Sequence, residues 1–182
     1  TGGFMMMPFG SAFNVNNLNV SLEQLPFIFM ITGMCSFIAG PIVGRLSDSI
    51  GKFKLFTAGS TISITMVLIF TNLQAAPFWL IVLLSVILFI GITSRIVSAS
   101  ALTSAVPELY DRGAFMAVNS SIQQFSGGFA SALAGLIVVQ GSSGRLERYN
   151  ILGLVVVFAM LLAIYMIYVT NKYVVSKYKS AV

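Results

Sequence analysis

Gly44-Arg45-Leu46-Ser47-Asp48-Ser49-Ile50-Gly51-Lys52-Phe53-Lys54 is a short charged segment that separates two long apolar runs of this chain. Its two glycines permit close approach and a positive φ, and most of the charge near this end of the two runs lies within it. A soluble core has no need of such a segment, whereas short basic loops are typical of the cytoplasmic side of membrane proteins. We therefore predict a tight charged turn over 47–54, joining two membrane spans.

The overall composition indicates a bilayer as the solvent. Of the 182 residues, 57% are hydrophobic and 8% are charged, with a mean hydropathy of +0.95, whereas soluble domains are about 25% charged. The net charge is +5, but the basic residues sit in short loops and in the tail, so nucleic-acid binding is not expected. The chain has no histidine and a single cysteine, Cys35. We therefore expect no metal site, no cofactor and no disulfide framework within the chain.

Apolar stretches long enough to cross a bilayer, which takes about 20 residues, recur along the chain. Five of them are complete, and a shorter one at the start resembles the C-terminal part of a helix. Because the chain begins with Thr1 and lacks a signal-peptide pattern, it is either processed or a piece of a longer protein. We predict an all-α membrane protein with six transmembrane helices, the first truncated, in a single domain over 1–182. The predicted spans cover about 1–13, 25–46, 55–73, 78–106, 114–139 and 151–171, and a cytoplasmic tail follows at 172–182.

The basic residues are distributed unequally between the two sides of these spans. The positive-inside rule assigns the richer side to the cytoplasm, which places both ends of the chain there. We therefore predict a multi-pass protein of the plasma (cell inner) membrane. The richer side carries Arg45, Lys52, Lys54, Arg112, Lys172, Lys177 and Lys179, and the other side carries Arg145 and Arg148.

The fifth predicted span differs from the other spans in its polar and small residues. Asn119 and Gln123 share one helix face, where they could bind a polar substrate or hydrogen-bond a neighbouring helix. Gly127, Ser131 and Gly135 form a small-xxx-small row of the kind that lets another helix approach closely. This span is therefore a candidate both for the wall of a cavity and for helix packing.

Segment 44–52, with the order Gly-x-Leu-Ser-Asp-x-x-Gly-Lys, resembles the cytoplasmic signature loop of the major facilitator superfamily, G-x-L-A-D-R-x-G-R-K. The chain departs from that pattern at Ser49 and Phe53, where the family usually has basic residues. Such departures are typical of the copy in the C-terminal half. The likeness rests on Gly44, Asp48, Gly51 and Lys52, and an ordinary positive-inside loop is the alternative interpretation.

Further resemblances to the family are spread over the chain. They imply a fold of twelve spans in two six-span halves with substrate held between them, this chain being the C-terminal half, built from two inverted three-helix repeats. They also imply that Asp48 contacts a helix end of the complementary N-terminal half, in the same or another chain, and holds the outward-open state. The matching segments, several of them typical of the drug and sugar efflux branch, are Pro8-Phe9, Arg95-Ile96-Val97, Pro107, Arg112–Met116, 119–124 and Gly128.

Arg95 is a charged residue inside a predicted span. It lies roughly 25 Å along its helix, near the cytoplasmic end of an approximately 30 Å core. It is therefore either a snorkelling arginine or a cavity residue that contacts substrate. Ser98 and Ala99 follow it where the family often has Gln-Gly.

The sequence as a whole predicts half of a secondary active transporter that moves a small organic solute or drug across the bilayer by alternating access, as an efflux protein. A non-transporting membrane scaffold or assembly subunit, held by small-residue helix packing, is the alternative. We do not expect an enzyme, because no histidine, acid or lysine stands within a span to serve a nucleophile.

Overall fold

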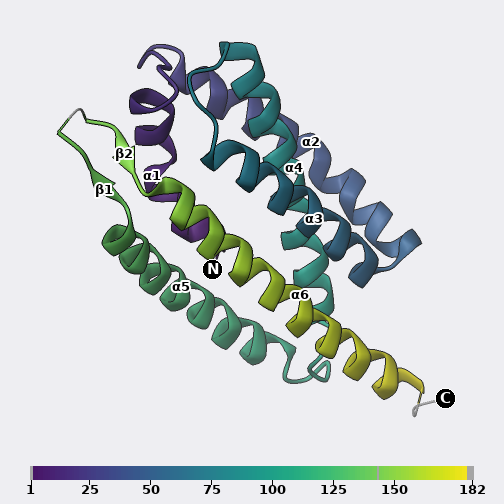
Figure 1. Cartoon of the computed structure of the whole chain (residues 1–182). Coiled ribbons are helices and arrows are strands. Elements are labelled where there is room, and N and C mark those ends of the chain that lie inside the picture. The colour runs from purple at the N-terminus through teal and green to yellow at the C-terminus, as the bar shows by residue number, and fades with distance from the viewer. Residues whose placement is uncertain (1, 143, 180–182) are drawn as a thin grey trace.

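The computed structural model describes residues 2–142 and 144–179, and within them the chain forms six α-helices and one short β-hairpin. The helical fold class predicted from the sequence is confirmed. Figure 1 shows the helices in their order along the chain. They are α1 (Gly2–Asn16), α2 (Leu25–Ile50), α3 (Lys52–Thr71), α4 (Phe78–Thr103), α5 (Arg112–Ile137) and α6 (Tyr149–Lys179), with strands β1 (Val139–Gln140) and β2 (Leu146–Glu147) between α5 and α6.

Four of the helices in the described part of the chain are long and apolar enough to cross a membrane. They are α2, α3, α4 and the Tyr149–Ser176 portion of α6. Helix α1 has only 15 residues, and α5 is long but carries many polar and small residues. Length and composition therefore identify four spans, whereas six were predicted.

The helices pack in two groups that α6 joins. Helix α4 packs against α2 and α3, and α1 packs against α5 and α6. Helix α3 also packs along α6, so α6 runs between α5 and the group of α2, α3 and α4 (Figure 1). Only one of these contacts, that of α3 with α4, joins helices adjacent in sequence. The arrangement is therefore set by side-chain packing rather than by the links.

Helices α3 and α4 approach each other closely along a seam of small residues. Gly59 and Gly91 face each other across it, and a Cβ on Gly91 would lie 2.6 Å from Ser63 Oγ and 3.0 Å from the Gly59 carbonyl oxygen. A Cβ on Gly59 would lie 2.7 Å from the Cβ of Ser94. Small residues let helix backbones come close enough for van der Waals packing, which is the main source of helix association in lipid. Larger side chains at Gly59 or Gly91 would therefore force the two helices apart.

An aromatic cluster fastens α1, α3 and α6 at the end of the bundle that carries the hairpin. The ring of Phe13 stacks on Tyr149 with centroids 4.0 Å apart and contacts Phe70 at 5.9 Å. Asn17 of the same α1 end donates from Nδ2 to the Leu146 carbonyl and accepts from the Leu146 amide at its Oδ1, each bond being 2.9 Å long. One side chain thus satisfies both backbone groups of a strand residue, which ties the hairpin to α1.

The links differ from the predicted ones in two places. The stretch between α5 and α6, predicted as a plain polar link, contains an antiparallel pair in which Val139 faces Glu147 and Gln140 faces Leu146. The predicted tail from Lys172 onward continues as helix to Lys179. The spacing of apolar residues could not predict either feature, because the hairpin depends on its contact with α1 and the end of α6 carries polar residues.

Candidate functional site

The predicted charged turn is mostly helical, and the prediction of a loop over 47–54 is wrong. Helix α2 continues through Ile50 and α3 begins at Lys52, so Gly51 alone separates the two helices. Gly51 has φ +100° and ψ 136°, a conformation that side chains with a Cβ rarely adopt. Gly44 lies inside α2 with nothing within 4 Å of a Cβ placed on it, so neither a turn nor a close approach requires that glycine.

Asp48 lies in the last turn of α2 and is exposed. The N-cap of α3 is Gly51, with no side-chain hydrogen bond, and within residues 2–142 and 144–179 the Asp48 carboxylate makes no hydrogen bond or ion pair. The neighbouring Ser47 is buried. The segment thus presents one carboxylate outward from the end of α2, available to a group outside the described chain.

Arg95 of α4 is half-buried and lies beside α3. Its guanidinium carbon is 5.7 Å from the centroid of the Phe56 ring, a cation–π distance. Its Nε is buried and has no hydrogen-bond partner among the described residues. The backbone nitrogen of Arg95 is 3.4 Å from a Cβ placed on Gly59, so this residue stands at the α3–α4 seam. The Arg95 charge therefore packs against an aromatic ring of α3, a contact that the sequence did not predict.

Asn119 and Gln123 lie on α5, which packs against α1 and α6 rather than along α4. Asn119 is half-buried and Gln123 is exposed. No hydrogen bond joins either side chain to Arg95 in the described ranges, so the structure does not bring the three cavity candidates together. The described residues therefore do not enclose a substrate site around these three positions.

The polar residues at the start of α5 and the buried small residues farther along lie on one continuous face of the helix. Positions 119, 123, 127, 130 and 134 recur at intervals of three and four residues, which places them on the same side of the helix. Of these, Gly127, Ala130 and Ala134 are buried. Asn119 and Gln123 therefore lie on the same face as the buried small residues, nearer to the start of α5.

The small residues of α5 contact α1 in part. A Cβ on Gly127 would lie 3.0 Å from Cγ of the Phe4 ring, and Ser131 donates a 2.8 Å hydrogen bond to the Phe4 carbonyl. Gly135, in contrast, is exposed with nothing within 4 Å of a Cβ placed on it. The packing row runs through Ala134 instead, one position earlier.

The small residues that line the α3–α4 seam were not among those predicted from the sequence. Gly59 and Ser63 on α3 stand four residues apart, and Gly91 is followed at three and seven residues by Ser94 and Ser98 on α4. The same small-residue spacing that drew attention to α5 would have identified both rows. Their pairing across the seam could not be read from spacing, because it joins positions distant in sequence.

Two polar cavities lie at the hairpin end of the bundle, away from the residues chosen from the sequence. One, of about 220 Å³, is lined by Asn17, Asn72 and Arg148 among others, and a second, of about 300 Å³, is lined by Asn17, Gln74 and Arg145. Both share Leu73 in their lining. They flank the Asn17 contact described above and lie at the bundle end opposite to the signature segment.

The sequence of this chain matches the family model of the Major Facilitator Superfamily over residues 1–181. No curated protein sequence matches it. The match covers nearly the whole chain, and four helices able to cross a membrane are present among the described residues, so the protein is an integral membrane protein of the transporter type. This chain belongs to the Major Facilitator Superfamily.

Proposed function

We propose that the chain is the C-terminal half of a secondary active transporter that exports a small organic solute or drug by alternating access. In this proposal all six helices cross the plasma (cell inner) membrane, and both chain ends lie in the cytoplasm. The complementary N-terminal half, in the same or another chain, completes the substrate cavity near the bilayer midplane, as expected for repeats that rock about a shared site. The observation that carries the proposal is the family match over residues 1–181.

The pattern of helix packing supports two inverted three-helix repeats. In such a repeat, α1 corresponds to α4, α2 to α5 and α3 to α6. The α1–α5 contact should then have a counterpart between α4 and α2, and the α1–α6 contact a counterpart between α4 and α3, while the α3–α6 contact is its own counterpart. All of these pairs pack together. A fold with an internal two-fold axis requires this correspondence.

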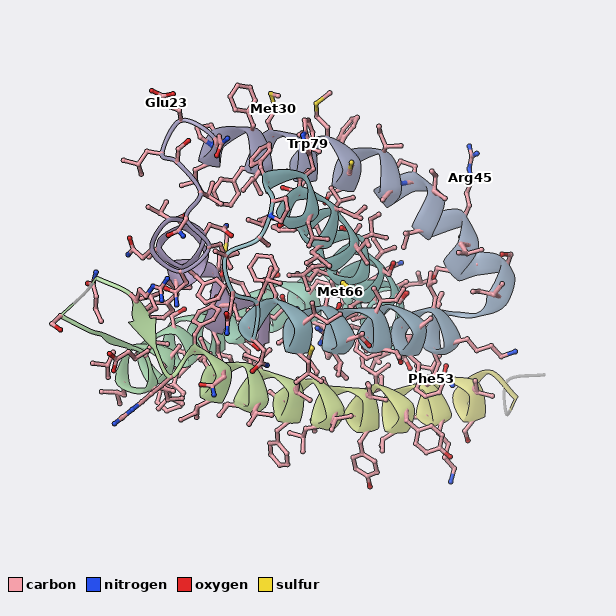
Figure 2. All side chains as sticks on the ribbon, turned by 45° about the horizontal axis from the view of Figure 1, so that its top comes forward. Glu23, Met30, Arg45, Phe53, Met66 and Trp79 are labelled. Atoms are coloured by element: carbon pink, nitrogen blue, oxygen red, sulfur yellow. The ribbon has the colours of Figure 1, made fainter. Side chains whose placement is uncertain are left out.

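The exposed apolar faces of α2 and α5 support docking of a second half. These two helices exchange under the repeat, and each carries a continuous stripe of large side chains, of which Phe37 is 84% exposed and Phe125 is 81% exposed. Figure 2 shows Met30 projecting from the same outer side of α2. On α2 the stripe consists of Phe27, Met30, Met34, Phe37 and Ile38, and on α5 of Val118, Ile122, Phe125, Phe129 and Leu136.

Charge at the two ends of the bundle supports the proposed orientation. Arg45 projects from the C-terminal part of α2, which leads through Gly51 to Lys52 and Lys54 in the first turn of α3. Glu23 lies before the other end of α2 (Figure 2). An excess of lysine and arginine marks the cytoplasmic side of membrane proteins. Asp48 lies on this same end, where we propose that it contacts a helix end of the N-terminal half.

Water access to Gln123 distinguishes a transporter from a non-transporting scaffold. In a Cys35→Ser background, we expect Gln123→Cys in native membranes to react with a membrane-impermeant maleimide, because a transport cavity admits water. Phe125→Cys is the matched control on the neighbouring apolar stripe and should resist the same reagent. A Gln123→Cys variant as unreactive as Phe125→Cys would favour a packed seam and hence a scaffold. Export is measured directly with ethidium, a fluorescent organic cation, in cells that make the protein.

A further inference from the structure

We propose that the cytoplasmic ends of α3 and α6 form a binding site for the headgroup of an anionic phospholipid. The site consists of the aromatic pair Phe53 and Tyr168 and of Lys52, Lys54 and Lys172, which we call the α3–α6 lysine cluster. It lies outside the substrate cavity proposed above and does not depend on which solute is carried.

The aromatic pair brings the ends of two sequence-distant helices together. The rings of Phe53 and Tyr168 lie 5.6 Å apart at an interplanar angle of 58°, and Figure 2 shows Phe53 next to α6. Phe53 is in the first turn of α3, and Tyr168 is 51% exposed. Tyrosine at such a place is typical of the membrane interface, where its ring lies among the lipid chains and its hydroxyl reaches the headgroups. The pair therefore marks the headgroup level at this corner of the bundle.

Three lysines lie close to this pair along the two helices. Lys52 and Lys54 flank Phe53 directly in sequence, and Lys172 lies about one helical turn beyond Tyr168, on the same side of α6. Lys54 and Lys172 are exposed and Lys52 is half-buried. None of the three forms a hydrogen bond or ion pair within the part of the chain that the structure describes. The ammonium groups of this end of the bundle are therefore available to an anionic ligand.

Charge complementarity and position identify the occupant as a lipid. Clusters of lysine at the cytoplasmic end of a spanning helix attract anionic headgroups, and each such lysine contributes about 1 kcal/mol, or roughly a fivefold gain in binding. The site opens between two helices long and apolar enough to span, so acyl chains can lie along their exposed sides. A soluble anion would gain the charge contacts but, having no acyl chains, would make no contact with the apolar sides of the helices.

The test places a fluorescent reporter at the site. In a Trp79→Phe background, Tyr168→Trp introduces the only indole of the chain, and quenching is measured in phosphatidylcholine vesicles that contain brominated phosphatidylglycerol or brominated phosphatidylcholine. We expect phosphatidylglycerol to quench at a much lower mole fraction. The double variant Lys54→Gln/Lys172→Gln should raise the half-quenching mole fraction at least fivefold, and Lys54→Arg/Lys172→Arg should restore it.

The matched control removes the same charge from the far end of α6. Arg145→Gln/Arg148→Gln should leave the half-quenching fraction unchanged, because these residues lie at the hairpin end. Equal quenching by the two brominated lipids in the parent, or equal effects of the lysine and arginine doubles, would overturn the proposal. Displacement of phosphatidylglycerol by inorganic phosphate at constant ionic strength would also overturn it, in favour of a soluble anion.

Discussion

Replacing Gly91 by alanine tests the packing of α3 against α4 directly. The new Cβ would lie 2.6 Å from Ser63 Oγ, 3.0 Å from the Gly59 carbonyl oxygen and 3.2 Å from the Ser63 nitrogen. Two of these atoms belong to the backbone of α3, so rotation of the Ser63 side chain relieves only the first contact. The two helices must therefore move apart by several tenths of an ångström along a seam that is otherwise fully packed.

The magnitude follows from two opposing effects. Overpacking of a well-packed interior costs about 1–3 kcal/mol, and the better helix propensity of alanine returns up to about 1 kcal/mol. We therefore expect Gly91→Ala to lower the free energy of unfolding by about 1–2 kcal/mol, taking both effects together. Ser63→Ala in the same chain should recover only part of this loss, because the contact with the Gly59 carbonyl remains.

Gly128→Ala is the control, since Gly128 is also helical but has nothing within 4 Å of a Cβ placed on it. This variant should be unchanged or slightly more stable. Stability is measured by titrating detergent-solubilised protein with sodium dodecyl sulfate and following helix content by circular dichroism. If Gly91→Ala proves as stable as Gly128→Ala, the close approach of α3 and α4 is wrong.

Three further substitutions test other parts of the fold. Asn17→Ala should lower the free energy of unfolding by about 1–3 kcal/mol, because both backbone groups of Leu146 lose their partner; Asn72→Ala, at an exposed site, is the comparison in the same titration. Gly51→Ala should cost about 1–2 kcal/mol, because a φ of +100° strains any residue with a Cβ; an unchanged thermal midpoint would mean that α2 and α3 meet without this conformation. Arg95→Met should change the free energy of unfolding by no more than about 1 kcal/mol, or raise it, since the buried Nε has no partner in the described chain. A large loss of stability would show that the charge is paired. Ethidium export by the same variant tests whether Arg95 also has a role in transport.

The helical structure of the signature segment holds the Asp48 carboxylate in a defined position, which a flexible loop would not do. A helix that continues to Ile50 holds Asp48 on a rigid element, so its direction is fixed by the helix and not by a flexible turn. Gly51 then reverses the chain within one residue, which keeps α2 and α3 together at this end. A contact made by Asp48 with another half would therefore be transmitted directly to α2, whose exposed apolar face is the proposed docking surface.

The sequence by itself determined the class of the molecule. The low share of charge and the long apolar runs predicted helices in a bilayer, because an unpaired backbone group in lipid is costly and helices satisfy their own hydrogen bonds. The order of residues around Asp48 led to the correct family, since a motif is local in the chain. Even there, residue types did not reveal that the motif is helical up to Gly51, because glycine, serine and charged residues are as frequent in turns as at helix ends.

Only the tertiary structure decided which helix faces meet. The seam between Gly59 and Gly91, the stacking of Phe13 on Tyr149 and the bonds from Asn17 to Leu146 each join positions far apart in sequence. Periodicity defines a face, but it does not say what covers that face. Spacing places Asn119 and Gln123 in line with Gly127 on α5, but only the structure shows that Phe4 of α1 covers Gly127 while Gln123 is exposed.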